Sequence, residues 1–224
     1  MDNKDAGLSR RQALLGAAGS LASLAGWIVE ARAYQGCLPT PMGPACEAGI
    51  NITRLPTIYA TQEMSQWCWA ASLEMIFSYY GYSVPQQAIV QATFGMVDNL
   101  PAFSGAFISS NLNRTWIDSG GRRFRSEIRG LYDFNAGMVA LNNQMIIEAL
   151  AQERPLLLGN TSHAVVLTAV SYSQAAWGPD IFNIGVLDPW PGIGMRGAQS
   201  PAELVPMHKG GQLRYLATPT ISMV

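Results

Sequence analysis

One stretch near residue 70 limits the choice of fold more than any other part of the chain. From Cys68 to Tyr80 the residues are almost all apolar, which predicts a buried helix, and Gly81 is a typical helix stop. Cys68 stands between Trp67 and Trp69, where this helix is expected to begin. A helix N-terminus favours a thiolate, so the position suits a nucleophile. The alternative is a small buried side chain, which is the commoner role of a lone cysteine.

A single mature domain is the expected organisation of these 224 residues. Hydrophobic residues make up 49% of the chain and charged residues 13%, about half of the usual share, and this composition excludes an intrinsically disordered protein. The formal net charge of -1 gives no electrostatic reason to expect nucleic acid or an anionic membrane as a partner.

The first 33 residues resemble a twin-arginine export signal. Ser9-Arg10-Arg11 precedes an apolar run from 13 to 29, and Ala31-Arg32-Ala33 fits the small-x-small site of a signal peptidase. The run is shorter than the ~20 residues of a good membrane span, so cleavage before Tyr34 is favoured over a membrane anchor. We therefore expect residues 34–224 to form the mature domain. It would be periplasmic or secreted by a bacterium, without stable membrane association.

Export bears on the three cysteines, because disulfides persist outside the cytoplasm. Cys37 and Cys46 flank a short loop rich in proline and glycine, and a disulfide between them would close it. Cys68 then has no partner, and an unpaired thiol in an oxidising compartment favours a catalytic role. A bridge from Cys68 to one of the other two cysteines is the alternative.

Helical patterns precede strand patterns along most of the mature chain. This order predicts an α+β fold, in which an N-terminal helical half with the buried nucleophile helix packs on a C-terminal antiparallel sheet. An extended segment is expected over 49–61 and a turn-rich loop over 171–180. Further helices are predicted over 85–93, 108–112 and 145–151, and strands over 156–159, 163–170, 181–187 and 213–217.

A basic run occupies the middle of the chain. Four arginines lie between positions 122 and 129 and alternate with Phe124, Ser126 and Ile128. This alternation is typical of a strand with one exposed face. A solvated face is therefore expected, and the wall of a substrate groove is the alternative.

The chain has two histidines, and His163 begins a strand of otherwise apolar residues. If strands 163–170 and 181–188 pair so that opposed residue numbers sum to 351, His163 faces Asp188. A carboxylate there would hold one ring nitrogen and leave the other for a thiol, as in a Cys-His-Asp site. A slip of one residue would separate the two side chains. The alternatives are that His163 is a hydrogen-bonded core histidine and that Asp188 only caps a turn. The second histidine, His208, is expected to be exposed.

Three motifs together resemble those of the papain-like cysteine peptidases, over about 55–217. They are Gln62 six residues before Cys68, the segment Ser162-His163-Ala164, and Leu187-Asp188-Pro189-Trp190. Trp-Cys-Trp-Ala-Ala is similar to the bacterial branch that includes type III effector peptidases of plant pathogens. The histidine strand and the Asp-Pro pair are similar to those of bacteriocin-processing peptidases. His163 follows Cys68 by only 95 residues, and the third member is Asp rather than Asn, which indicates a compact bacterial variant.

The resemblance implies acyl transfer through a thioester. Cys68 would be the nucleophile, His163 the general base and then the acid, and Asp188 the group that fixes the tautomer of His163. The oxyanion would be held by the backbone N–H of Cys68 and the side-chain amide of Gln62, with Gln66 as the alternative amide.

No cofactor or metal is expected. The histidines lie 45 residues apart and no Cys-x-x-Cys occurs, which argues against zinc, and Gly192-Ile193-Gly194 lacks the strand-to-helix context of a nucleotide loop. We expect an exported cysteine peptidase that acts as a monomer on protein or peptide substrates. Two other functions stay open: a transamidase or cell-wall peptide amidase with the same triad, and a catalytically silent binding module of the same fold.

Overall fold

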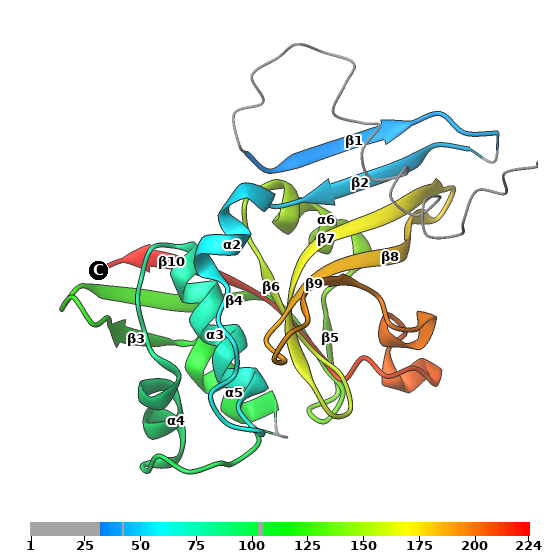
Figure 1. Cartoon of the computed structure of the whole chain (residues 1–224). Coiled ribbons are helices and arrows are strands. Elements are labelled where there is room, and N and C mark those ends of the chain that lie inside the picture. Colours follow the sequence, from blue (N-terminus) through cyan, green and yellow to red (C-terminus); the bar gives the residue numbers. More distant parts are fainter. Residues whose placement is uncertain (1–31, 42, 103–104) are drawn as a thin grey trace, which may run out of the picture. The chain divides into compact units, whose positions relative to one another are not determined.

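A computed structural model describes residues 32–41, 43–102 and 105–224 of the chain (Figure 1). The contacts of the chain divide it into residues 1–30 and 31–224, and only the second unit is described below. The export signal predicted for residues 1–33 therefore lies outside the described residues, except for its last two positions. Within the described ranges, no helix combines the length and the hydropathy that a membrane crossing requires.

The predicted α+β class is confirmed, and the helices occupy much of the first half of the described chain. They are η1 (Ile52–Arg54), α2 (Leu55–Ile58), α3 (Cys68–Tyr79), α4 (Gln86–Phe94), α5 (Gly105–Leu112) and α6 (Asn143–Ala151), with two short turns, η2 (Pro201–Glu203) and η3 (Met207–Lys209), later in the chain.

The extended segment predicted for 49–61 is wrong in its centre, where η1 and α2 form. The side chain of Asn51 accepts a hydrogen bond from the Thr53 N–H and so caps the first of these turns. Pro56 follows in the first turn of α2, where a proline costs no hydrogen bond.

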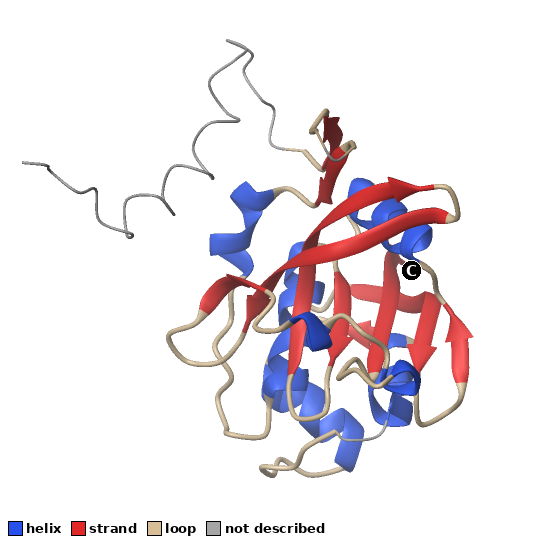
Figure 2. Ribbon diagram, turned by 90° about the vertical axis from the view of Figure 1, so that its right-hand side faces the viewer, coloured by secondary structure: helices blue, strands red, loops and turns tan. Residues whose placement is uncertain are grey.

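Ten strands of the described residues form one antiparallel sheet. Its path runs β1-β2-β7-β6-β10-β4-β3, while β8 pairs with β7, β9 with β8 and β5 with β4. The strands are β1 (Tyr34–Leu38), β2 (Ala45–Gly49), β3 (Arg114–Ile117), β4 (Arg123–Asp133), β5 (Met138–Ala140), β6 (Leu156–Gly159), β7 (Ala164–Ala175), β8 (Gly178–Asp188), β9 (Gly194–Gly197) and β10 (Tyr215–Met223). Strands are thus spread more widely along the chain than the sequence predicts. Figure 2 shows the twisted sheet with helices packed against it.

Two sequence predictions about side chains of the sheet are confirmed. Cys37 and Cys46 form a disulfide between directly paired positions of β1 and β2. The basic run lies on β4, where Arg125 and Arg129 are exposed while Phe124 is buried, so it forms a solvated face.

The loop predicted for 171–180 is wrong, because β7 and β8 continue through it as a long hairpin. Strand β7 extends to Ala175 and β8 begins at Gly178, whose φ of 117° suits a tight turn. The predicted register is also wrong, since Val166 pairs with Leu187 and the opposed numbers there sum to 353. At the end of the hairpin next to Asp188 the error is two residues, which is one full strand period, so the side chains there stay on their predicted faces. From Ala169 to Ser171, beyond a shift in register, the opposed numbers sum to 354.

Helix α3 is the buried helix that the sequence predicts, and it ends where Gly81 takes a φ of 85°. It packs against β6, β7 and α4. Leu73, Ile76 and Phe77 are fully buried, and buried residues occur all round the helix, as expected of a helix inside a core. This packing holds the first residue of α3 close to the ends of β6 and β7.

Candidate active site

Cys68 is the first residue of α3 and is partly exposed. Its neighbours Trp67 and Trp69 are buried, and their ring N–H groups donate to the carbonyl oxygens of Asp98 (2.9 Å) and Leu100 (3.2 Å). Two anchored indoles therefore hold the start of the helix on either side of the thiol. The backbone N–H at this first helical position has no acceptor within the helix, and the helix dipole adds partial positive charge there.

His163 lies immediately before β7, at the end of a tight β6–β7 connection. Gly159 pairs with Ala164, and within the turn the His163 N–H donates to Oδ1 of Asn160 at 2.8 Å. The Asn160 N–H in turn donates to the carbonyl oxygen of His163 at 2.9 Å. The asparagine side chain thus determines where the imidazole begins its reach toward α3.

His163 and Asp188 form a short ion pair, with 2.6 Å between Nε2 and Oδ1. Asp188 ends β8 and is 1% exposed, and its Oδ1 also accepts the Trp190 N–H at 2.9 Å. The Trp190 ring stands edge-on to the imidazole, with 6.1 Å between ring centroids. Because Nε2 binds the carboxylate, Nδ1 is the ring nitrogen left for a thiol.

The charges in this site favour an ion pair at neutral pH. Burial lowers the pKa of His163, but hydrogen bonds with Asp188 and with Cys68, together with their charges, raise it to about 9. Burial raises the pKa of Asp188, but hydrogen bonds from His163, Arg196 and the Trp190 N–H lower it to about 2. Asp188 is therefore a carboxylate at pH 7, and the raised pKa of His163 favours an imidazolium beside it.

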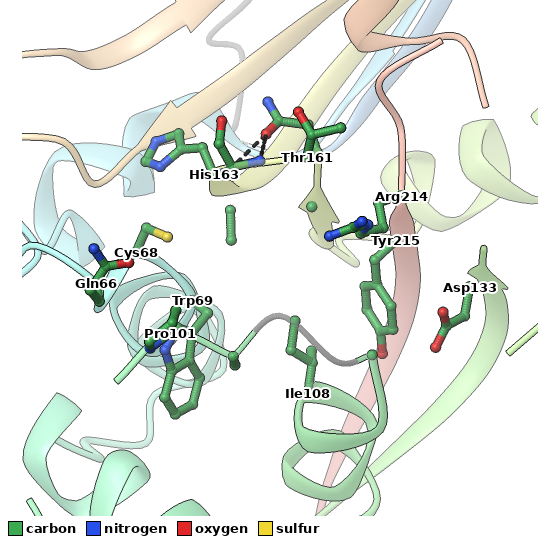
Figure 3. A pocket seen from close by; sticks show the side chains of 16 residues that line it. Gln66, Cys68, Trp69, Pro101, Ile108, Asp133, Thr161, His163, Arg214 and Tyr215 are labelled. Carbon is green, nitrogen blue, oxygen red and sulfur yellow. Dashed lines mark hydrogen bonds between the residues drawn. The ribbon is translucent and has the colours of Figure 1, made fainter. Parts of the chain in front are cut away.

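A cavity of about 50 Å³ opens beside these residues (Figure 3). Cys68 and His163 lie at one end and Asp133 at the other, with Ile108 and Tyr215 between them. The Asp133 carboxylate accepts backbone N–H groups from the turn after β4. A larger hollow of about 880 Å³, lined in part by Tyr132, Trp177 and His208, includes none of Cys68, His163 and Asp188. We place the site at the smaller cavity because the reactive groups are there.

The two glutamines proposed for the oxyanion have different environments. Gln62 is buried, and its Nε2 donates to the carbonyl oxygens of Met64 (3.0 Å) and Ser65 (3.1 Å), so both amide hydrogens have acceptors. Gln66 is exposed and lines the cavity next to Cys68 (Figure 3). The structure therefore brings Gln66 to the cavity and directs the Gln62 amide to the main chain.

Arg196, a cation that no sequence pattern singles out, contacts the candidate triad. Arg196 on β9 donates from Nε to Oδ2 of Asp188 at 2.7 Å, and its other nitrogens bind Glu203. No local motif marks these two residues, since a lone Arg in a turn-rich segment usually lies in solvent. Only the return of the chain through β9 reveals the contact. His208, as predicted, is exposed.

Comparisons with known proteins give the family of this chain. Residues 50–200 match the family model described as papain-like cysteine protease AvrRpt2, and this range contains all three residues of the candidate triad. Among solved structures, UfSP from C. elegans is similar to 90% of this chain at 14% sequence identity, with a TM-score of 0.41. The similar region is 36% of that protein, so the chain spans about a third of its length. A search of curated proteins finds no match.

Proposed function

Because the chain belongs to the family of the papain-like cysteine protease AvrRpt2 and is a papain-like cysteine peptidase, we propose that it hydrolyses peptide bonds through Cys68, His163 and Asp188. The observation that carries this proposal is the His163–Asp188 ion pair of 2.6 Å, which leaves Nδ1 for the thiol at the start of α3. Protein or peptide substrates follow from this activity.

In the proposed mechanism the Cys68 thiolate attacks the substrate carbonyl, and a tetrahedral oxyanion forms. His163 donates its proton to the leaving amine, which departs as the thioester forms. His163 then takes a proton from water, whose oxygen attacks the thioester. The acid product is released with the Cys68 thiolate, and the starting pair of thiolate and protonated His163 is restored. Asp188 keeps the imidazole in one orientation and stabilises its protonated form throughout.

The oxyanion needs donors that are in place before the reaction. The Cys68 N–H at the helix start is one donor, and a glutamine amide is the second. Loss of a single such donor typically lowers kcat by about 10²–10³-fold. In the present conformation Gln66 borders the cavity, whereas Gln62 would have to release Met64 or Ser65 first. Gln66→Ala should then lower kcat more than Gln62→Ala, and the reverse order would return the role to Gln62.

The two histidines provide a matched test of the triad. We expect His163→Ala to abolish cleavage of a peptide library and to slow iodoacetamide labelling of Cys68 at pH 7. His208→Ala should leave both unchanged, because its ring is exposed and contacts Tyr132 rather than the cavity beside Cys68. Cys68→Ala removes the labelled thiol altogether, since the other two cysteines are joined.

Two outcomes would replace hydrolysis by another function. If Cys68 is labelled rapidly but no library peptide is cut, acylation of an added amine would identify a transamidase, and hydrolysis of cell-wall peptides would identify an amidase. If Cys68 reacts no faster than a free thiol and Cys68→Ala keeps the biological effect, the chain is a binding module.

We infer that the peptidase is exported by the twin-arginine route and acts in the periplasm or outside the cell as a monomer. The twin arginines at 10 and 11 support this inference, and so does the Cys37–Cys46 disulfide, because such bonds persist in oxidising compartments. Replacing Arg10 and Arg11 by Lys should retain the full-length chain in the cytoplasm, as measured by fractionation and mass spectrometry of the N-terminus. Unchanged export would contradict the route.

A further inference from the structure

Asp188 is held from two sides, and the proposed triad accounts for only one of them. Its Oδ1 accepts from His163 and from the Trp190 N–H, whereas its Oδ2 accepts from Nε of Arg196 at 2.7 Å. The side chain of Arg196 is only 11% exposed, so this ion pair is largely shielded from water. Both oxygens of the carboxylate are therefore fixed.

Glu203 binds the opposite side of the same guanidinium. Its Oε1 accepts from Nη2 at 2.8 Å and its Oε2 from Nη1 at 3.1 Å, a bidentate pairing with directional preference. Oε2 also accepts the Gln199 N–H at 2.9 Å, and Nη1 of Arg196 donates to the Gly197 carbonyl at 2.9 Å. Glu203 is 1% exposed, so Arg196 is clamped between two buried carboxylates.

The turn after Asp188 is what brings Arg196 to this place. Gly192 and Gly194 take φ values of 81° and 65°, which let the chain reverse and return as β9 beside β8. Gly194 then pairs with Asp188, and Arg196 pairs with Val186. Met195 points to solvent, and the strand period turns Arg196 inward.

Stability is a weak explanation for three such charges. Buried ion pairs usually lose about as much in desolvation as they gain in attraction, and apolar replacements are often neutral. The sum of the three charges instead favours a protonated His163. Asp188 and Glu203 carry two negative charges and Arg196 one positive charge, so the cluster presents a net charge of -1 to His163, which balances an imidazolium.

We propose that Arg196 is a positioning residue that fixes the orientation of the Asp188 carboxylate, and that Glu203 neutralises Arg196 so that Asp188 keeps its full attraction for the His163 imidazolium. This inference rests on the proposed function. Among the described residues, the charged or titratable groups that act on His163 are Cys68 from α3 and Asp188 from β8, and those that act on Arg196 are Asp188 and Glu203.

Glu203→Gln tests the electrostatic part with almost no change of shape. Removing one negative charge leaves the positive Arg196 uncompensated, so His163 loses its proton at lower pH. The alkaline limb of the kcat/KM–pH profile should move down by roughly one pH unit, the order expected from Coulomb's law for a charge on the far side of the Arg196 guanidinium at an effective dielectric constant of ~20. Glu127→Gln, in an exposed ion pair with Arg125 on β4, is the matched control and should not move the limb.

Two variants of Arg196 test the positioning part. Arg196→Lys keeps the charge but lacks the planar fork that binds Glu203 through two nitrogens and Asp188 through the third, so kcat should fall about 10-fold with KM nearly unchanged. The double variant R196M/E203L removes the clamp without changing the net charge and should keep the fold, but kcat should fall at least as far. Circular dichroism and thermal melting check the fold of each variant.

The inference is overturned if the folded double variant retains kcat within twofold of the unmodified enzyme, or if Glu203→Gln leaves the alkaline limb in place. Should the double variant fail to fold, the limb of Glu203→Gln and the kcat of Arg196→Lys decide the matter in the same way. These failures differ from failure of the triad itself. In that case the unmodified protein would neither cleave peptides nor show rapid labelling of Cys68.

Discussion

Replacing Asp188 by Asn removes one charge from the centre of the site and leaves the shape of the side chain almost unchanged. The pKa of His163 is raised from 6.5 to about 9 against the effect of burial, a change worth about 3 kcal/mol, and the hydrogen bond with Asp188 is the largest single contribution that raises it. An asparagine has one acceptor oxygen, whereas Asp188 accepts from His163 on one oxygen and Arg196 on the other. The side-chain nitrogen of the asparagine must therefore face either His163 or Arg196, and that hydrogen bond is lost.

We expect Asp188→Asn to move the alkaline limb of kcat/KM down by at least about one pH unit, because the imidazolium loses its main support. At pH 8 the fall in kcat/KM should lie between about 10- and 100-fold, which corresponds to roughly 1.4–2.7 kcal/mol of transition-state stabilisation. The assay measures peptide cleavage and iodoacetamide labelling of Cys68 from pH 5 to 10. Asp180→Asn, an exposed carboxylate on the same strand, is the matched control.

The result that would refute this reasoning is a folded Asp188→Asn enzyme with an unmoved alkaline limb and an undiminished kcat/KM at pH 8. Asp188 would then be a turn-capping residue, and the ion pair with His163 would have no part in catalysis. Thermal melting accompanies the assay, because breaking a buried charge pair costs about 3–5 kcal/mol in many proteins.

Three further outcomes follow from the packing and the charges. Replacing Cys37 and Cys46 by serine should lower the free energy of unfolding, measured with urea, by about 2–3 kcal/mol. The kcat/KM should stay within about twofold, because no residue of the β1–β2 hairpin lines the cavity. A larger loss of activity would contradict this. Phe77→Ala should destabilise by about 3–5 kcal/mol, because its ring is fully buried, and a loss under 1 kcal/mol would show that the core closes over the gap. The stabilisation that His163 contributes to the fold should be complete below pH 6.5 and vanish as the pH rises through about 9. That from Asp188 should be complete above pH 3.8 and vanish as the pH falls through about 2. Urea titrations of His163→Ala should therefore lack the loss of unfolding free energy at alkaline pH.

Local patterns were sufficient for the elements that a short segment specifies by itself. The apolar run after Cys68 and the glycine at 81 predicted α3 and its end, because burial and a left-handed stop are local requirements. The alternation around Phe124 predicted an exposed strand for the same reason. The spacing of Cys37 and Cys46 around a tight loop indicated their disulfide.

Tertiary structure decided the features that depend on pairing between distant segments. The β7–β8 register differs by two residues from the prediction, and His163 still reaches Asp188 because a shift of two keeps a side chain on the same face. Which glutamine borders the cavity depends on the loop path before α3, and no periodicity reports such a path.

The clearest division between sequence and tertiary structure lies at Asp188. The sequence predicts that Asp188 ends a strand before a proline turn, because a few consecutive residues are enough to specify turns and strand ends. The sequence does not predict its second partner, Arg196, because the contact exists only after two glycines reverse the chain and β9 pairs with β8. The sequence determined which groups could react, and the fold decided which charges hold them, since electrostatic interactions depend on distances that only packing establishes.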